Sequence, residues 1–466
     1  MSRADDPDAN SSGPKNGESE RRVGWLSRIA LIGRDEWPAA ALSFVYFFFL
    51  LFSYYILRPV RDEMGVRGGI DNMHWLFTAT FIAMLFMVPL FASLAARLRR
   101  STLMPSVYGI FIACIGGFWF WLESGIAMDW AARAFFVWLS VFNLFVISVF
   151  WSFMADIFDS EQATRLFGFI AAGGSMGAIL GPGLTGFLAQ TLPPRDLLLI
   201  AGGALLCTLP CIWALQYWQT QGAASSRSVA QNTQALGGTL LEGFRAIASS
   251  RYLMGICVFI WLYTTLSTFL YFAQADIVES TFSDSGDRTS VFAALDFATN
   301  TLTVLLQLFL TARLVQKLGL QRALAAVPLL VAGGFACLAL APVITVLFGF
   351  QLVRRAGNYA ITKPGREMLF TVLPRMEKYK AKNIIDTLVY RGGDAIAGWM
   401  FAGLTALGLS LMSIAWLSVP VALIWALIGY GLGKERIKRV RQADSALSGK
   451  KQEDIRYEHS ESTPAP

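Results

Sequence analysis

Long apolar stretches recur along almost the whole chain, from Trp37 to Gly433, and only short polar interruptions separate them. Each stretch has roughly the 17 to 25 residues that a helix needs to cross the hydrocarbon core of a bilayer. Lipid offers no hydrogen-bond partners to a peptide backbone, so a spanning segment has to be a helix or part of a closed barrel. Because the stretches lack the polar-apolar alternation of barrel strands, the sequence predicts an all-α membrane protein.

Composition and charge agree with this fold class. Hydrophobic residues make up 55% of the chain and charged residues 15%, with a mean hydropathy of +0.50. That balance is too apolar for the surface of a water-soluble protein. The net charge of +7 would suggest a nucleic-acid partner in a soluble protein, but membrane topology accounts for it here. We therefore expect a lipid bilayer around the chain and no nucleic acid.

The apolar stretches divide into two halves. The longest internal polar segment, 219–250, predicts a cytosolic linker between a six-helix bundle over 37–218 and a second six-helix bundle over 251–433. The polar start, 1–36, predicts a disordered cytosolic tail, and 434–466 predicts a basic, disordered one. We place twelve transmembrane helices near 38–63, 74–96, 102–122, 132–157, 165–191, 197–218, 251–280, 289–314, 320–341, 343–370, 383–407 and 409–433.

Short echoes relate the two halves. Ala96-Arg97-Leu98 after the second helix is repeated as Ala312-Arg313-Leu314 after the eighth. A second echo sets 171–175 of the fifth helix against 390–394 of the eleventh, at nearly the same separation along the chain. Repeats of this kind are typical of transporter folds.

Basic residues indicate the orientation of the chain in a bacterial inner (cytoplasmic) membrane. They gather after every even-numbered helix and in both tails, at 97–100, Arg165, 313–322, 375–382 and 434–441, so both termini should be cytosolic. We expect no cleaved signal peptide near Met1, because no short apolar core with a small-residue cleavage site lies there. Arg58, Arg61 and Arg67 break the charge rule in the first outward connection, which hints at function.

Metal, disulfide and ATP-driven chemistry are not indicated. The chain has five cysteines, all in apolar segments, and its two histidines are His74 and His459. Neither histidine joins a cysteine in a ligand cluster, so we expect no metal site, no cofactor and no disulfide framework. No phosphate-binding Gly-x4-Gly-Lys-Ser/Thr loop occurs, so gradients or exchange must supply the energy.

Ionisable residues inside apolar segments cost several kcal/mol and normally face a cavity or a partner. We predict that Arg61 and Arg391 occupy corresponding places in the two halves and direct guanidinium groups into a shared cavity, where they bind an anion. Internal salt bridges, or an interfacial position for Arg61, explain the same residues. Arg58, Arg355 and Lys363 are further substrate-binding candidates.

Carboxylates in the second half are candidates for coupling or for charge compensation. Asp386 and Asp394 lie within about two helical turns of Arg391, so local neutralisation is expected. Asp296 lies near the centre of the eighth helix without a basic neighbour within one turn, which makes it a candidate proton site. A buried, hydrogen-bonded acid explains Asp296 equally well. Asp276, late in the seventh helix, completes this set.

The fifth helix carries regularly spaced small residues. Gly177, Gly181, Pro182 and Gly186 follow Gly168 at intervals that let helices approach closely and slide. Packing alone explains the spacing as well. The spacing resembles the antiporter motif of the major facilitator superfamily, and the loop at 95–100 resembles that superfamily's inner-gate loop without its usual aspartate.

Four segments carry a closer resemblance: 56–62 (Ile-Leu-Arg-Pro-Val-Arg-Asp), 150–153, 362–371 and 388–393. They resemble the nucleotide exchange transporters of plastids and intracellular bacteria, which are ATP:ADP antiporters, and the segment 362–371 is similar to the bacterial branch. The resemblance implies a major-facilitator-like fold and ATP/ADP-type exchange. This sequence has arginines at Arg61 and Arg391 where the exchangers have lysines. The exchangers also have a carboxylate within the fourth helix, whereas this sequence has none between Arg133 and Asp156.

The leading hypothesis is a monomeric secondary transporter, not an enzyme, for an anionic and phosphorylated metabolite, with a nucleotide as the first guess. It would work by alternating access between the two halves. A proton-coupled exporter of an organic or amphipathic compound is one alternative. A flippase-like accessory or membrane enzyme for envelope lipids is another.

Overall fold

The structure is a computed structural model that describes residues 33, 36–97, 100–222, 245, 247–309, 311–374, 381–382 and 384–461. Of the cytosolic tail predicted over 1–36, only Gly33 and Glu36 are described. Most of the linker predicted over 219–250 and the last residues of the C-terminal tail lie outside the described residues.

The first half of the chain forms helices that begin and end at recognisable signals. Helix α2 has a proline in its first turn, and α6 begins at Asp159, whose side chain caps the helix in a reciprocal box with Gln162. Helices α7 and α8 together form one candidate span. The helices are α2 (Trp37–Arg67), α3 (Met73–Arg97), α4 (Arg100–Ser124), α5 (Met128–Ile157), α6 (Ser160–Leu188), α7 (Leu197–Leu206) and α8 (Thr208–Gly222), with a 3₁₀ turn, η1, at Ile70–Asn72.

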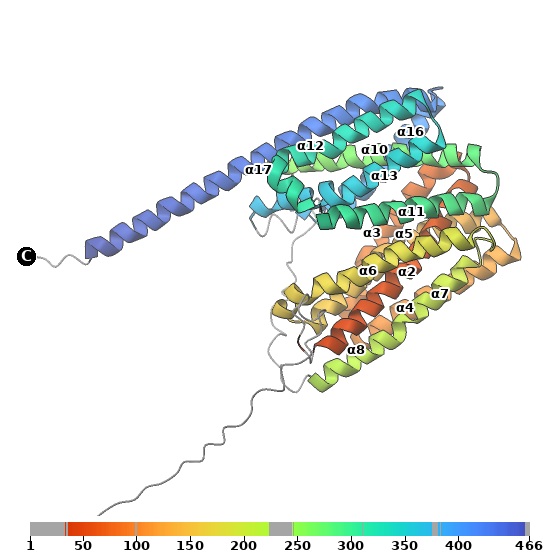
Figure 1. Cartoon of the computed structure of the whole chain (residues 1–466), viewed down its shortest axis with the longest axis horizontal. Helices are drawn as coiled ribbons and strands as arrows, with labels where there is room; N and C mark the ends of the chain where they lie inside the picture. Colours follow the sequence, from red (N-terminus) through yellow and green to blue (C-terminus); the bar gives the residue numbers. More distant parts are fainter. Residues whose placement is uncertain are drawn as a thin grey trace, which may run out of the picture.

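The second half is built in the same way but is more often interrupted. Its helices are α10 (Arg251–Thr281), α11 (Ser285–Phe309), α12 (Thr311–Leu340), α13 (Ile344–Gly357), α14 (Lys363–Leu369), α16 (Tyr390–Ala406) and α17 (Leu411–Glu461). Two π-helical segments, η2 (Asn358–Thr362) and η4 (Ile385–Val389), adjoin α13 and α16, and the 3₁₀ turn η3 (Phe370–Val372) follows α14. Helix α17 continues far beyond the bundle (Figure 1).

The all-α membrane fold is confirmed, but the number of spans differs from the predicted twelve. Within the described residues, ten helices are long and apolar enough to cross a membrane. The tenth and eleventh predicted helices are not among them, because π-helical segments divide them into shorter pieces that also carry charged residues. The count of twelve stays a prediction. Single π-turns within helices occur frequently at functional sites.

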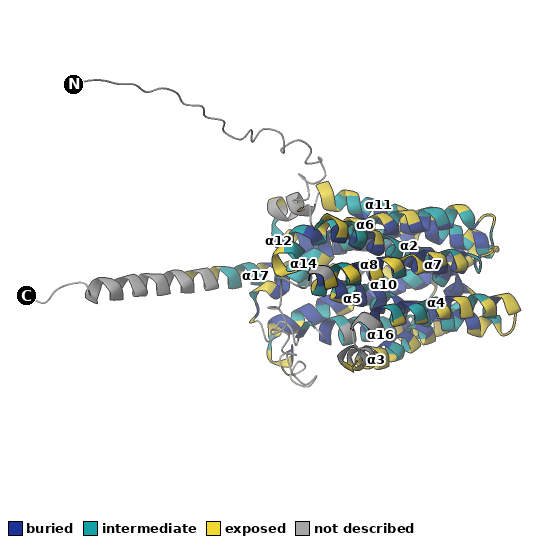
Figure 2. Ribbon diagram, turned by 90° about the horizontal axis from the view of Figure 1, so that it is seen from below, coloured by how far each residue is buried: buried dark blue, intermediate teal, exposed yellow. Residues whose placement is uncertain are grey.

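Buried apolar side chains fall into two clusters, each centred on one half of the chain. One cluster draws on residues 39–215, and the other on 247–432 together with Val66 and Met73. Figure 1 shows the two groups of helices side by side, coloured red to yellow and green to blue. Figure 2 shows that exposed residues gather on the outer faces of the helices, as expected where lipid replaces water.

Helices α6 and α11, and α3 and α16, bring the two halves together. The glycines predicted to allow helices to slide divide between two tasks. A Cβ atom at Gly177 would overlap the carbonyl oxygen of Phe48, and one at Gly181 would lie 2.8 Å from that of Phe52, so both residues let α6 pack tightly on α2 within the first half. Pro182 is buried beside them. Gly186 faces α11 of the second half, where a Cβ atom would lie 3.6 Å from the Cβ of Ala293.

Candidate functional site

A cavity of about 420 Å³ lies between the two halves and is lined by α2, α3, α5, α10, α13, η2, α14 and α16. Basic side chains dominate its polar lining, although each of them interrupts an otherwise apolar helix. They are Arg58, Arg61, Arg354, Arg355, Lys363 and Arg391. All five predicted substrate-binding residues therefore line one cavity, together with Arg354.

Arg61 forms an ion pair with its neighbour on the same helix. Its Nη2 and Nε lie 2.6 Å and 3.1 Å from Oδ1 of Asp62, whose side chain is 5% exposed. Tyr271 on α10 donates a hydrogen bond of 2.9 Å to the same oxygen. Asp62 thus holds Arg61 in place and joins α2 to the second half.

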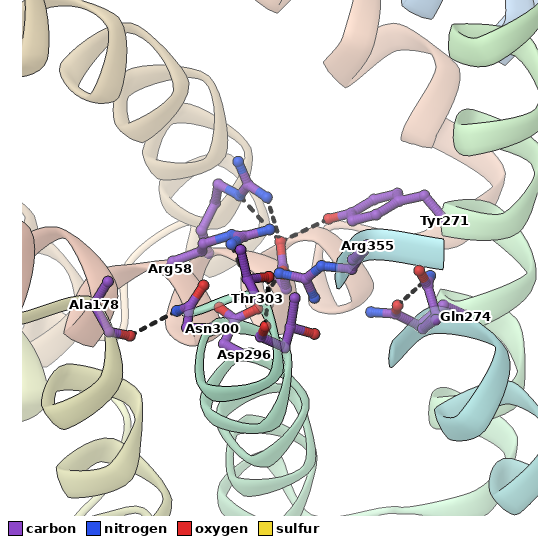
Figure 3. Close-up of polar contacts among 12 residues, drawn as sticks. Arg58, Ala178, Tyr271, Gln274, Asp296, Asn300, Thr303 and Arg355 are labelled. Carbon is purple, nitrogen blue, oxygen red and sulfur yellow. Dashed lines mark hydrogen bonds and ion pairs between the residues drawn. The ribbon is translucent and has the colours of Figure 1, made fainter. Parts of the chain in front are cut away.

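Asp296 forms ion pairs with two arginines that are distant from it in the sequence. Arg355 on α13 donates a hydrogen bond to its Oδ1, and Nη1 of Arg58 on α2 lies 3.5 Å from the same atom. Figure 3 shows the two arginines converging on this carboxylate from different elements. Asp296 has no basic neighbour within one turn of its own helix, but it has two in space. Its side chain is 1% exposed.

Arg354 is buried, with 8% of its surface exposed, and neutral groups hold it. Its Nε and Nη2 donate to Oε1 of Gln351 at 3.3 Å and 2.8 Å, and its Nη1 donates to Oγ of Ser267 at 2.6 Å. Gln351 in turn donates from Nε2 to Oε1 of Gln274 at 2.5 Å. Arg354 is not among the binding residues that the sequence predicts.

Arg391 is held more loosely than the other arginines. Its Nη1 lies 3.8 Å from Oδ2 of Asp394, and its side chain is 31% exposed. Thr268 donates to Oδ1 of Asp394 at 3.3 Å, which ties α16 to α10. The guanidinium also lies over the ring of Tyr390, 5.6 Å from its centroid.

A second cavity, also of about 420 Å³, adjoins the first and shares Lys363 and Arg391 with it. It extends toward the end of the molecule where α10 begins. Asp386 lines this second cavity and pairs with Arg366 at 3.2 Å, not with Arg391. Lys363 is exposed to both cavities and has no ion-pair partner among the described residues.

Asp276 is separate from the other predicted charge partners. Its side chain is exposed, and it lines neither cavity. It lies on the face of α10 away from the cavity, because helix rotation places it about 140° to 180° from Ser267 and Tyr271, which line the cavity. The apolar sequence around Asp276 therefore does not show that its side chain is buried.

The cavity that Arg58 and Arg391 line carries an excess of positive charge. Its six basic side chains are accompanied by three carboxylates, those of Asp62, Asp296 and Asp394, which leaves a net excess of three positive charges. The remaining lining is rich in tyrosine, a feature that the sequence did not single out. These residues are Tyr54, Tyr55, Tyr263, Tyr271, Tyr359 and Tyr390.

The two halves are bonded to each other at the end away from the chain termini. Arg288 on α11 donates to both carboxylate oxygens of Glu63 on α2, at 2.6 Å and 2.8 Å, and Glu63 is fully buried. Nearby, Ser290 donates to the carbonyl of Gly186, and Trp399 donates to Thr78. The two residues are 225 positions apart in the chain, so the sequence alone does not predict their contact.

Two groups of helices that enclose a charged central cavity are an arrangement typical of membrane transporters. The family model described as Major Facilitator Superfamily matches residues 40–361, so the chain belongs to that superfamily. It is accordingly a secondary transporter and not an enzyme. The superfamily resemblance read from the glycine spacing is confirmed. No curated protein sequence matches the chain.

Solved structures show the same fold at low sequence identity. The POT family transporter PepTSo aligns with a TM-score of 0.61 and 12% identity, over 86% of this chain and 98% of that one. The nucleoside transporter NupG aligns with a TM-score of 0.53 and 14% identity, over 88% and 99%. A bacterial homolog to the human lysosomal transporter Spinster, in an inward-facing and unoccupied conformation, gives 0.50 and 13%, over 88% and 98%.

Proposed function

We propose that this transporter carries a phosphorylated anion across the bacterial inner membrane by alternating access, with a nucleotide as the first candidate substrate. The observation that carries the proposal is the excess of three positive charges in the central cavity. Arginine forks match phosphate and carboxylate oxygens in pairs, so a multiply charged anion would satisfy several of them together. Arg61 and Arg391 contribute from opposite halves.

The aromatic lining supports a nucleotide over a simple phosphate ester. Tyrosine and phenylalanine rings beside the arginines offer a stacking surface for a base, and the tyrosine hydroxyl groups offer hydrogen bonds to a sugar. The fold likeness to the nucleoside transporter NupG is compatible with such a ligand. The resemblance to nucleotide exchange transporters points to the same substrate class.

Exchange, rather than net uptake, follows from the cost of moving the empty cavity. Uncompensated charges are expensive within a membrane, so reorientation without a bound anion would have to carry three of them through the barrier state. A bound anion removes most of that cost. We propose an antiporter that acts as a monomer and has both termini in the cytosol, with the second cavity as its cytosolic entrance.

The test uses purified protein in proteoliposomes loaded with unlabelled ADP and measures uptake of labelled ATP. We expect uptake that depends on internal ADP and that is lost in Arg61→Ala and in Arg391→Ala. Empty liposomes and the distant variant Arg439→Ala serve as controls, because Arg439 pairs with Glu435 outside the cavity. Absence of uptake by the wild type for nucleotides and other phosphorylated anions would refute the proposal, and normal uptake by both cavity variants would refute the site.

A further inference from the structure

The arginines of the central cavity are not equivalent, and the difference lies in what already balances their charge. Arg58 and Arg355 share Asp296, Arg61 is paired with Asp62, and Arg391 lies near Asp394. Among the described residues, Arg354 contacts only neutral acceptors. It is therefore a buried cation with no carboxylate in direct contact, although Asp394 is near enough to interact with it electrostatically.

We propose that Arg354 is the principal anchor for the negative charge of the substrate, and that Gln351 and Gln274 hold it in place without neutralising it. The proposal rests on the proposed anion transport. It assigns the first contact to a residue other than the pair, Arg61 and Arg391, that the sequence favours.

Energetics support this assignment. A buried charge that lacks a counter-charge costs several kcal/mol, even when neutral groups hydrogen-bond to it. A fold can retain such a residue where binding of an oppositely charged ligand offsets the cost. Functional residues with this property lower the stability of the unliganded protein.

The geometry leaves part of the guanidinium available. The bonds to Gln351 and Ser267 use three of the five N–H donors of Arg354. Because Arg354 also lines the central cavity, the remaining donors can reach a ligand there. A phosphate or carboxylate oxygen is the acceptor that this arrangement fits best.

The positioning depends on amides where carboxylates would be the usual partners. Gln351 is 1% exposed and Gln274 is 4% exposed, so neither amide is hydrated. Gln351 accepts two bonds from Arg354 through one oxygen and uses its amide nitrogen to bind Gln274. A glutamate in place of Gln351 would keep the shape and the two accepted bonds but would cancel the charge.

The variant Gln351→Glu therefore tests whether the uncompensated charge of Arg354 matters for binding. Gln274 can rotate its amide and donate to the new carboxylate, so the local hydrogen bonds survive. We expect the affinity for ADP to fall at least tenfold, and the thermal unfolding temperature of the unliganded protein to rise. Arg354→Gln should lose affinity and gain unliganded stability in the same way, whereas a purely structural arginine would lose stability on removal.

The measurement is thermal unfolding of the purified full chain in detergent, with and without ADP and, separately, inorganic pyrophosphate. The matched control is Gln442→Glu, the same charge change on the exposed outer part of α17, which should behave as the wild type does. Wild-type affinity in Gln351→Glu would overturn the role of Arg354.

The same experiment separates this proposal from the proposed function. If neither ADP nor pyrophosphate stabilises the wild type, anion transport by this cavity is wrong. The unliganded temperatures then decide the status of Arg354. Higher temperatures in Arg354→Gln and Gln351→Glu support an uncompensated cation, and lower temperatures in both overturn it.

Discussion

The bond between Glu63 and Arg288 offers the most direct test of how the two halves move. It joins α2 to α11 at the end remote from the termini, with both carboxylate oxygens engaged and Glu63 fully buried. Opening of the molecule at this end has to separate the pair. The variant Glu63→Gln removes the charge and keeps one acceptor oxygen.

The expected magnitude follows from burial. Breaking a buried ion pair by removing one partner costs about 3 to 5 kcal/mol. Arg288 also donates to the carbonyls of Phe282 and Ser283, at 3.1 Å and 3.0 Å, so it stays partly satisfied and the lower end of that range applies. About 3 kcal/mol corresponds to a change of roughly 100-fold in the ratio of the closed to the open state at this end.

Distance measurements between spin labels can detect this change. Thr191 and Ser283 are exposed residues of opposite halves near this end, and cysteines can replace them after the five native cysteines are removed. We expect a longer-distance population to appear in Glu63→Gln. The control is Glu36→Gln, because Glu36 pairs with Arg165 inside one half. An unchanged distance distribution in Glu63→Gln, or an equal change in the control, would refute the reasoning.

Four further outcomes follow from the structure. Asp296→Asn leaves two arginines without a carboxylate and should lower unfolding stability by about 3 to 5 kcal/mol, measured by thermal or chemical denaturation. Arg58→Gln leaves Asp296 in a neutral pair, so the empty carrier should reorient more easily. Efflux of preloaded ADP into nucleotide-free buffer should then rise relative to exchange. Gly177→Ala should destabilise the protein by roughly 1 to 3 kcal/mol through overpacking, whereas Gly168→Ala, with open space around it, should be neutral or slightly stabilising. Hydrogen bonds from an arginine hold the pKa of Glu36 below its usual 4.5. The stability difference between wild type and Glu36→Gln should therefore be full above about pH 4.5 and should shrink as the pH falls through the lowered pKa, in an unfolding series from pH 7 to pH 3.

The fold was predictable because one physical constraint dominates it. Apolar runs in lipid have to be helices, and the helices begin and end within a few residues of the predicted limits at most positions, as with 251–280 against Arg251–Thr281. The π-helical segments escaped prediction because no local signal distinguishes a π-turn from an α-turn. In the structure, they divide the tenth and eleventh predicted helices, which are therefore absent from the ten long apolar helices of the described residues.

The candidate site was predictable in its members but not in their pairing. Rarity of charge in apolar segments identified Arg58, Arg61, Arg355 and Arg391, and all of them line one cavity. The pairing of Asp296 with Arg58 joins residues 238 positions apart, and helix periodicity carries no information on such contacts. Asp276 shows the reverse error, since its position in an apolar helix does not place it in the cavity.

Two groups of cations in the cavity have different relations to the motion between the halves. Arg354 and its amide partners belong to α10 and α13, so their network can move with the second half as one unit. Arg58 belongs to the first half, and its carboxylate, Asp296, belongs to the second. Any rotation between the halves therefore changes the charge balance at Arg58 while it leaves that at Arg354 unchanged. When the halves rotate, Arg58 would lose its ion pair with Asp296. An anion held by Arg354 and in contact with Arg58 would compensate the charge of Arg58 in that state. Substrate binding would then be coupled to reorientation through electrostatics alone.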